Sequence, residues 1–247
     1  MRKRFLEYSI SIVIPAYNEE SNIFDVVTDS LNVLESLTDR YEVVVMDDAS
    51  KDRTGKILDE MAAKNADTVR ILHHAINQGT NLSLIELFRS ARYELVFFLP
   101  ADKQILPSSI VSYLETLRDE KVDIVMGVRE ERADPLHRLF FNWAYRVAMR
   151  FLLGLSLRDG TASDLYKKSI LDQVPMDSRG RLLQAEIAAA AVSLGYKIKE
   201  IPVAHYPRMA GKQTGIHPKT MWLSALDLWQ VGSKIRALKR QRLRPQG

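Results

Sequence analysis

Residues 95–104 read LVFFLPADKQ and join an apolar strand to a polar end. The run at 95–98 fits a strand that is covered on both faces, as in parallel sheets. Asp102 and Gln104 follow at what would be the carboxyl end of this strand, and Pro107 begins the next helix. Open α/β sheets bind their ligands in the crevice at that end of the strands. The segment therefore predicts an α/β fold with an oxygen-rich site.

The same alternation of strand and helix extends along the first half of the chain. Short apolar strands separated by helices of ten or more residues are typical of a parallel sheet with helices on both faces. The predicted strands are 9–15, 41–46, 69–72, 95–99 and 122–127. The predicted helices run over 18–37, 52–64, 79–90 and 107–118.

The second half of the chain is less regular. Amphipathic helices are predicted at its two ends, with an alanine-rich helix and one alternating strand between them. In chain order the predicted elements are an amphipathic helix over 135–153, a polar loop over 158–168, a helix over 182–194, a strand over 197–205, a mobile loop over 207–218 and a final amphipathic helix over 219–238.

Composition limits the class of protein. With 247 residues, 46% of them hydrophobic, and a mean hydropathy of −0.16, the chain can form one large α/β domain with a substantial core. It contains no cysteine, which excludes disulfide scaffolds, thiolate zinc sites and cysteine nucleophiles. Residues 1–4 lack the apolar region of a secretory signal, and no stretch reaches the roughly 18 apolar residues of a membrane span. We expect a cytoplasmic protein.

Positive charge is concentrated at the carboxyl end. The formal net charge is +4, yet residues 208–247 hold nine Lys or Arg against one acid, Asp227. This asymmetry predicts contact with phosphate groups, on a lipid surface or on nucleic acid, or else a basic tail that is simply solvated. Because no nucleic-acid recognition motif accompanies the charge, we expect no nucleic-acid partner.

Polar residues follow four of the predicted strands. Tyr17 to Glu19, Asp47-Asp48, Asn77 and Asp102 all come at carboxyl ends, where an open parallel sheet keeps its ligand crevice. The alternative for Asn18, Asp48 and Asp52 is that they only cap the helices that follow. That alternative is reasonable for each residue alone and explains all four loops together poorly.

Several motifs resemble glycosyltransferase family 2. The opening motifs are VIPAYNEE at 13–20 and VMDDASKDRT at 45–54, and NQG at 77–79 and the aspartate segment at 99–104 fall at the expected intervals. Further on, QAEI at 184–187, GYKIKEIPV at 195–203 and RMAGK at 208–212 resemble the polyprenyl-phosphate sugar synthases, of which dolichyl-phosphate mannose synthase is a member. The resemblance covers roughly residues 9–215.

The resemblance implies a GT-A fold, a Rossmann-like nucleotide-sugar-binding sheet with helices on both faces. It also implies an inverting, nucleotide-sugar-dependent glycosyltransferase that transfers a sugar from a GDP- or UDP-linked donor to a polyprenyl phosphate at the cytoplasmic membrane face. Residues 1–215 would form the glycosyltransferase domain. Residues 216–247 would form an amphipathic helix and basic tail that contact the membrane surface or a membrane partner subunit. The sequence predicts no oligomeric state.

The resemblance also assigns residues to the donor. The residues that would bind the nucleotide sugar are Pro15, Ala16, Tyr17, Glu19, Asp47, Asp48, Asn77, Gly79, Asp102 and Lys212. Asp102, with Gln104, would hold Mg²⁺ or Mn²⁺ on the donor diphosphate. The family pattern has two aspartates around one residue, and Pro100 stands where the first is expected. We therefore expect a weaker metal site that takes several ligands from water and phosphate.

Catalysis and the acceptor are assigned to the basic residues of the second half. The predicted catalytic residues are Asp102, Arg129, Arg208 and Asp159, and Arg129, Arg138 and Arg208 would orient the acceptor phosphate. A phosphate monoester is already an anion and needs no general base, so cations that orient it suffice. Asp159 would shape the sugar pocket, or would serve as the base if the acceptor is instead a hydroxyl. The five histidines are therefore predicted to be structural.

Two alternatives stay open at this point. The same donor chemistry can act on a soluble or glycan hydroxyl, or the chain can be a non-catalytic nucleotide-sugar binder whose metal site is weakened at Pro100. The role of Glu186 is also open, because this residue either shapes the sugar pocket or pairs with a nearby Arg. Asp102, Gln104 and Arg208 occurring together favour the enzyme.

Overall fold

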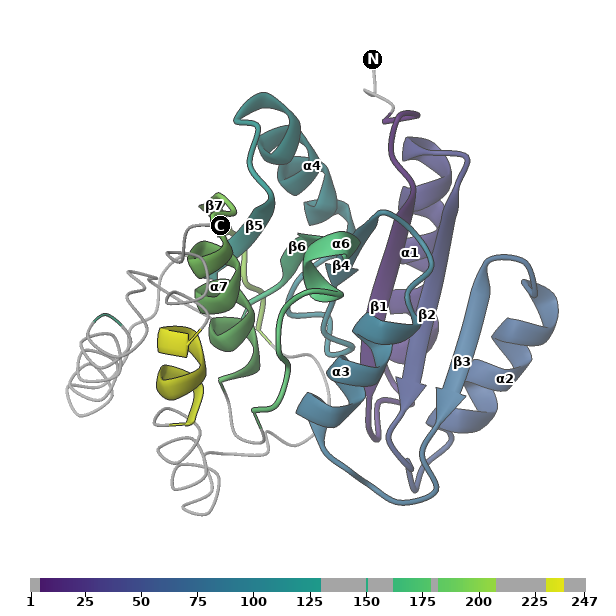
Figure 1. Ribbon diagram of the computed structural model, residues 1–247. Coiled ribbons are helices and arrows are strands. Elements are labelled where there is room, and N and C mark those ends of the chain that lie inside the picture. Colours follow the sequence, from purple (N-terminus) through teal and green to yellow (C-terminus); the bar gives the residue numbers. More distant parts are fainter. Residues whose placement is uncertain (1–4, 130–149, 151–161, 179–181, 208–229, 238–247) are drawn as a thin grey trace.

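The computed structural model describes residues 5–129, 150, 162–178, 182–207 and 230–237 (Figure 1). All but residue 150 of the predicted helix over 135–153, all but residue 207 of the predicted loop over 207–218 and most of the helix and tail beyond it lie outside the described residues. The division into a domain at 1–215 and a tail at 216–247 therefore stays a prediction.

The first part of the chain alternates strands and helices as the sequence predicts. The elements are β1 (Ile10–Ala16), α1 (Ile23–Leu37), β2 (Tyr41–Asp47), α2 (Thr54–Lys64), β3 (Val69–His73), α3 (Thr80–Ser90), β4 (Leu95–Phe98), the short 3₁₀ helix η1 (Pro107–Ser109) and α4 (Ile110–Asp119). The later elements are β5 (Ile124–Arg129), β6 (Asp164–Lys167), α6 (Lys168–Leu171), α7 (Leu183–Leu194) and β7 (Ile198–Val203).

The described strands form one seven-stranded sheet in the order β3-β2-β1-β4-β6-β5-β7. All neighbouring pairs are parallel except β4–β6 and β5–β6, so β6 alone runs against the others. The mixed, mostly parallel α/β fold is the one that the sequence predicts. Because six strands point the same way, their carboxyl ends share one edge of the sheet.

Strand β6 corrects the sequence prediction. The segment 158–168 is predicted as a polar loop, but residues 164–167 form a strand inserted between β4 and β5. Leu165 pairs with Phe97 on one side and Val125 on the other, and it is fully buried. A strand of four residues with an acid at one end and a lysine at the other shows no alternating pattern. Its pairing partners, which lie far away in sequence, make it a strand.

Alternate residues of the central strands sort the core into two layers. Ile12 and Ile14 of β1 pack with α1, α2 and α4 on one face, and Val13 packs with α3 and α7 on the other. Figure 1 shows α3 in front of the sheet and α1 behind it. Each large apolar side chain buried in this way contributes roughly 1.5–3 kcal/mol to folding. The two layers fix the sheet edge and the loops that project from it.

Residues 230–237 are helical and belong to the second layer. Val231 and Ile235 are buried in the same apolar cluster as α7. The rest of the predicted carboxyl-terminal amphipathic helix lies outside the described residues. Within the part of the chain that the structure describes, no helix has the length and apolar character needed to cross a bilayer.

Candidate active site

One edge of the sheet collects the predicted donor-binding loops. Ala16 lies opposite Asp47 at the ends of β1 and β2, and Asp47 lies opposite His73 at the end of β3. Strand β4 is shorter and ends beside Val13, so the loop with Asp102 starts at the same edge. Every predicted site residue that the structure describes lies at this edge or in the loops that leave it.

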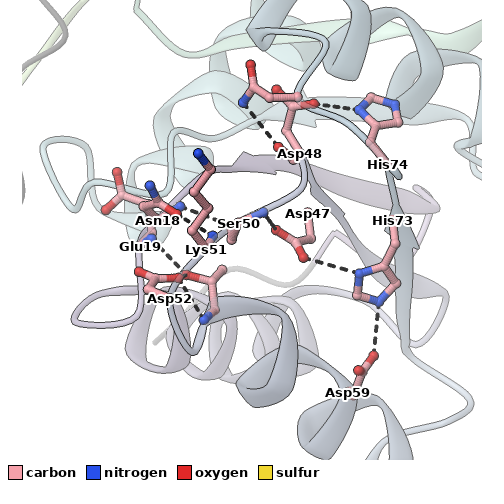
Figure 2. Close-up of polar contacts among 12 residues, drawn as sticks. Asn18, Glu19, Asp47, Asp48, Ser50, Lys51, Asp52, Asp59, His73 and His74 are labelled. Atoms are coloured by element: carbon pink, nitrogen blue, oxygen red, sulfur yellow. Dashed lines mark hydrogen bonds and ion pairs between the residues drawn. The ribbon is translucent and has the colours of Figure 1, made fainter.

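The loops after β1 and β2 are joined by reciprocal hydrogen bonds (Figure 2). The Asn18 backbone N–H donates to Ser50 Oγ at 2.9 Å, and the Lys51 N–H donates to Asn18 Oδ1 at 2.7 Å. The Glu19 N–H donates to Thr54 Oγ1 at 2.8 Å. Asn18 has a positive φ of 56°, a conformation that asparagine tolerates better than most residues. Helix α1 therefore starts only at Ile23, later than predicted, because Asn18 belongs to a turn.

Asp52 strengthens the same junction. Its Oδ1 accepts the Thr54 backbone N–H at 2.9 Å and Thr54 Oγ1 at 2.6 Å, and its Oδ2 accepts the Glu20 N–H at 3.2 Å. Burial acts to raise the pKa of Asp52, but these hydrogen bonds outweigh it, and the net pKa lies below the ordinary value. Asp52 and Asn18 thus hold the loops together, a structural role close to the capping alternative.

Glu19 and Tyr17 differ in accessibility. Glu19 is only 8% exposed, and its Oε2 accepts the Asn22 side-chain amide at 2.8 Å. Tyr17 is 37% exposed at the rim of the edge, next to the half-buried Pro15. Ala16 uses its carbonyl oxygen to accept the Asp48 N–H at 2.9 Å. Tyr17 is thus accessible to a ligand, while one carboxylate oxygen of Glu19 is already hydrogen-bonded within the protein.

Asp48 anchors the third loop. Its Oδ1 accepts the Gln78 N–H at 2.8 Å, and its Oδ2 accepts the Gly79 N–H at 2.8 Å. The Asn77 side-chain amide donates to the Asp48 carbonyl oxygen at 3.1 Å. The Asp48 residue is 3% exposed. Asp48 is therefore more than a helix cap, because it fixes the loop over 77–79 that is also predicted to bind the donor.

His73 and His74 contact the two aspartates of β2 and its loop (Figure 2). His73 Nδ1 lies 3.2 Å from Asp47 Oδ2, and Asp47 Oδ1 accepts the Ser50 N–H at 3.0 Å. His74 Nδ1 lies 2.6 Å from Asp48 Oδ1. The sequence analysis assigned no site role to these histidines. The pair His73-His74 at the end of β3, next to the pair Asp47-Asp48 at the end of β2, could have indicated the contact.

The predicted metal ligands lie in a tight turn. Asp102 Oδ1 accepts the Gln104 N–H at 3.1 Å across Lys103, which has a φ of 58°. The Gln104 carbonyl oxygen accepts the Tyr206 N–H at 2.9 Å, and Gln104 Nε2 donates to the Tyr206 carbonyl oxygen at 3.4 Å. These contacts orient Gln104 against the segment after β7.

The donor set of this turn fits a divalent cation that the protein holds only in part. Asp102 Oδ2 and Gln104 Oε1 accept no hydrogen bond from the described residues, so both oxygens are available as ligands. No cluster of three or more acidic or histidine side chains suited to a metal occurs among the described residues. Mg²⁺ and Mn²⁺ prefer oxygen ligands and Mg²⁺ often keeps several waters. The site therefore suits an ion whose remaining ligands come from substrate and solvent.

The predicted acceptor residues are only partly described. Arg129 ends β5, opposite Val203 of β7, and its position is on the same edge as Asp102. Arg138, Asp159, Arg208 and Lys212 lie outside the described residues, so their predicted roles remain predictions. Of the arginines and the lysine predicted for the site, only Arg129 is among the described residues.

Asp164 is a residue at this edge that the sequence analysis missed. It begins β6, pairs with Phe98 and Met126, and is 1% exposed. Asp164 Oδ2 accepts Tyr166 Oη–H at 2.8 Å and the Gln184 side-chain amide at 2.7 Å. Burial and the carboxylate raise the pKa of Tyr166 well above its ordinary value. In the sequence, the only indication was an aspartate directly before Leu165 and Tyr166, two large side chains of the kind that a strand buries.

Glu186 contacts the backbone of the segment before α7. It is fully buried in α7, and its Oε2 accepts the backbone N–H groups of Asp177 at 3.0 Å and Ser178 at 2.9 Å. Burial raises the pKa of Glu186 above its ordinary value, against the lowering effect of these hydrogen bonds. Among the described residues its partners are backbone amides and not an arginine.

The chain is similar in sequence to known glycosyltransferases. The family model described as glycosyl transferase family 2 matches residues 11–173. The polyprenol monophosphomannose synthase of Mycolicibacterium smegmatis is 26% identical over 81% of this chain and 78% of its own length. The undecaprenyl-phosphate mannosyltransferase of Micrococcus luteus is 29% identical over 81% of this chain and 84% of its own length.

Other curated relatives are longer. The chain spans 62% of the undecaprenyl-phosphate 4-deoxy-4-formamido-L-arabinose transferase of Edwardsiella ictaluri, which is 29% identical over 82% of this chain. These relatives therefore contain sequence that has no counterpart in the 247 residues.

Solved structures confirm the fold. The glucosyl-3-phosphoglycerate synthase of Mycobacterium tuberculosis with UDP superimposes with a TM-score of 0.69 at 19% identity, over 92% of this chain and 80% of that one. The mannosyltransferase PcManGT of Pyrobaculum calidifontis with GDP-Man and Mn²⁺ gives a TM-score of 0.61 at 19% identity, over 93% and 74%. Both are glycosyltransferases with the GT-A fold predicted here. With two thirds of its length matched by the family model, the chain belongs to glycosyl transferase family 2.

Proposed function

We propose that this protein transfers a sugar from a nucleotide diphosphate sugar to a polyprenyl phosphate, with inversion at the transferred carbon. The supporting observation is that Asp102, Gln104 and Arg129 leave the same sheet edge as the donor loops after β1, β2 and β3. The names of the relatives in Mycolicibacterium and Micrococcus support the acceptor class.

Each group at the edge has a role in this reaction. Tyr17 and Pro15 form the exposed wall for the base, and the loop that Asp48 holds borders the nucleotide. Asp102 and Gln104 would hold Mg²⁺ or Mn²⁺, which when bound neutralises charge on the departing nucleoside diphosphate. Solved relatives hold Mn²⁺ or Mg²⁺ together with UDP or GDP-Man.

Arg129 serves the acceptor side. A phosphate monoester is an anionic nucleophile, so a cation that orients it toward the sugar replaces a general base. Arginine suits this task because its planar guanidinium binds phosphate oxygens in pairs. Arg138 and Arg208 join it in the proposal, and Lys212 borders the diphosphate. The proposal places the protein at the cytoplasmic face of a membrane, where residues 216–247 contact anionic lipid or a membrane subunit.

The test is a transfer assay with the full chain, Mn²⁺, radiolabelled nucleotide sugars and undecaprenyl or dolichyl phosphate. We expect label in the organic phase for at least one donor. Label found only in a water-soluble glycan would instead support the hydroxyl-acceptor alternative. Donor binding without any transfer would support the non-catalytic binder.

Asp102→Asn tests the metal role in the same assay. The change keeps the size of the side chain and removes its charge, and we expect transfer to fall about 100-fold or more, as for loss of a group that stabilises developing charge. Asp25→Asn is the matched control, because Asp25 pairs with Lys103 beside Asp102 and has no proposed ligand role. Undiminished transfer by Asp102→Asn would contradict the assignment.

A further inference from the structure

His74 has carboxylate oxygens at both ring nitrogens. Its Nδ1 lies 2.6 Å from Asp48 Oδ1, and its Nε2 lies 3.2 Å from Glu86 Oε2 of α3. The His74 side chain is 5% exposed and the Glu86 side chain 46%. Ionised carboxylates only accept hydrogen bonds, so both ring nitrogens must donate. Only the imidazolium form of His74 donates in both contacts at once.

The imidazolium completes the set of donors around Asp48. Asp48 Oδ1 accepts from His74 and the Gln78 N–H, while Oδ2 accepts the Gly79 N–H. Hydrogen bonds with a charged donor are shorter and roughly twice as strong as neutral ones. Because Asp48 is almost fully buried, a compensating cation also removes much of the cost of its charge.

The proposed donor carries a diphosphate to an edge that is rich in carboxylates. Asp47 at the end of β2, and Asp48 and Asp102 in the loops, all lie at this edge. A cation at His74 offsets the charge of Asp48 and lowers the repulsion that the diphosphate meets. Deprotonation of His74 weakens the contact that holds Asp48 against the loop over 77–79. It also leaves the charge of Asp48 without a compensating cation. The two effects act in the same direction on donor binding.

We propose that His74 is a positioning residue that acts through Asp48: as an imidazolium it clamps the Asp48 carboxylate and the Asn77–Gly79 loop for the donor, so that donor affinity falls when His74 deprotonates. The inference rests on the proposed function, since it takes the nucleotide sugar as the ligand. The charged groups that face the ring are Asp48, from the loop after β2, and Glu86, from α3. Its neighbour His73 contacts Asp59 of α2, on the opposite face of the sheet.

The protonation equilibrium agrees with this geometry. Burial acts to lower the pKa of His74, but the hydrogen bonds and charges of Asp48 and Glu86 outweigh it, and the net pKa lies above 6.5. The clamp is therefore complete below pH 6.5 and is lost as the pH rises through the raised pKa.

The first experiment follows His74 and its loop in the full chain without a donor. We expect NMR titration to give the His74 ring a pKa above 6.5 that Glu86→Gln lowers. Asp59→Asn is the matched control, because it removes the same kind of outer carboxylate from His73 and leaves the His74 pKa unchanged. The protection factors of the Gln78 and Gly79 amides, which are their exchange rates relative to the intrinsic rate at each pH, should fall as His74 deprotonates. Protection factors that do not change with pH would overturn the clamp.

The second experiment measures binding of GDP-mannose and UDP-glucose with Mn²⁺ by calorimetry across the same pH range. The diphosphates of these donors keep their charge there, so a change in affinity reports on the protein. We expect the better donor to bind about fivefold more weakly above the His74 pKa, the size of one charge-assisted hydrogen bond reduced to a neutral one. The Glu86→Gln variant should show the same loss at a lower pH, and Asp59→Asn should match the wild type.

His74→Asn separates positioning from a general structural effect. Asparagine keeps a donor near the Nδ1 position and does not titrate, so donor affinity should be lower at acidic pH and nearly independent of pH. The wild-type pH dependence persisting in His74→Asn would overturn the inference. If His74→Asn does not fold, the shift in Glu86→Gln carries the same test. Absence of binding by either donor at any pH would count against the proposed function, while the donor-free titration and exchange still decide the clamp.

Discussion

Gly79 is the residue with the most specific backbone requirement at the candidate site. It has φ 88° and ψ 158°, a region that side-chain-bearing residues almost never occupy, and it directly precedes α3. A Cβ at this position would meet no atom within 4 Å. We expect Gly79→Ala to lower the free energy of unfolding by about 1–3 kcal/mol through backbone strain alone. Urea denaturation checks this, and an unchanged midpoint would show that the loop relaxes without cost.

A second residue-scale prediction concerns the pH dependence of stability. The folded pKa of His74 is raised, so its stabilising contribution is fully present below 6.5 and is lost as the pH rises through the folded value. The difference in unfolding free energy between the wild type and His74→Asn should therefore be larger at pH 6 than at pH 9. Denaturation curves at several pH values measure the difference. A constant difference would mean that His74 does not titrate in this window.

At the scale of elements, Gly127 fixes how closely α4, β5 and β6 pack. A Cβ there would lie 2.1 Å from Tyr113 Oη and 2.8 Å from the Ser163 carbonyl oxygen. Tyr113 Oη–H donates a hydrogen bond of 2.8 Å to that carbonyl oxygen. Gly127→Ala should cost about 2–4 kcal/mol of unfolding free energy by overpacking, whereas Tyr113→Phe should cost about 1 kcal/mol for the lost hydrogen bond. Tyr113→Phe with Gly127→Ala should recover part of the loss, and thermal melts of the three variants test this.

Helix α7 gives a second element-scale prediction. Glu186 carries a raised folded pKa, so between 4.5 and that value the native state binds more protons than the unfolded state. Stability from this group consequently falls as the pH rises through the window. Glu186→Gln can still accept the two backbone N–H groups, and its stability should fall less with pH than that of the wild type. Parallel pH dependences would show that Glu186 is ionised throughout.

At the scale of the whole molecule, the donor and the cation should stabilise the folded chain together. A ligand at 100 times its dissociation constant adds about 2.7 kcal/mol to the unfolding free energy. Because Asp102 and Gln104 supply only two oxygens, we expect Mn²⁺ alone to shift the melting temperature little and Mn²⁺ with a nucleotide sugar to shift it by several degrees. Calorimetry with each ligand alone and both together measures the coupling. If the shift with both ligands were only the sum of the two separate shifts, the ion would bind at a site other than the one at Asp102 and Gln104.

Membrane contact is the other prediction at this scale. Residues 208–247 hold nine basic residues against one acid, and a basic segment of this kind binds anionic lipid more strongly than neutral lipid. In liposome sedimentation we expect the full chain to bind vesicles with anionic lipid at low salt and to dissociate as salt is raised. Failure to bind under either condition would remove the peripheral-membrane part of the proposal.

The amino-acid sequence by itself determined most of the first half of the fold. Runs such as 43–46 and 95–98 are apolar and short, a pattern that is typical of strands buried in a covered parallel sheet. The direction of those strands then put Asp48 and Asp102 on one edge before any coordinates were needed. Local pattern was sufficient because each of these elements shows its own periodicity.

Only the tertiary structure decided the features that depend on partners distant in sequence. Strand β6 exists because β4 and β5 border it, and its own four residues carry no strand pattern. Asp48 is predicted to bind the donor, and the tertiary structure adds that its carboxylate oxygens contact the loop at 77–79 and His74. The residues in these hydrogen bonds lie about thirty positions apart. They meet because β2 and β3 are neighbours in the sheet, and local sequence does not encode which strands become neighbours.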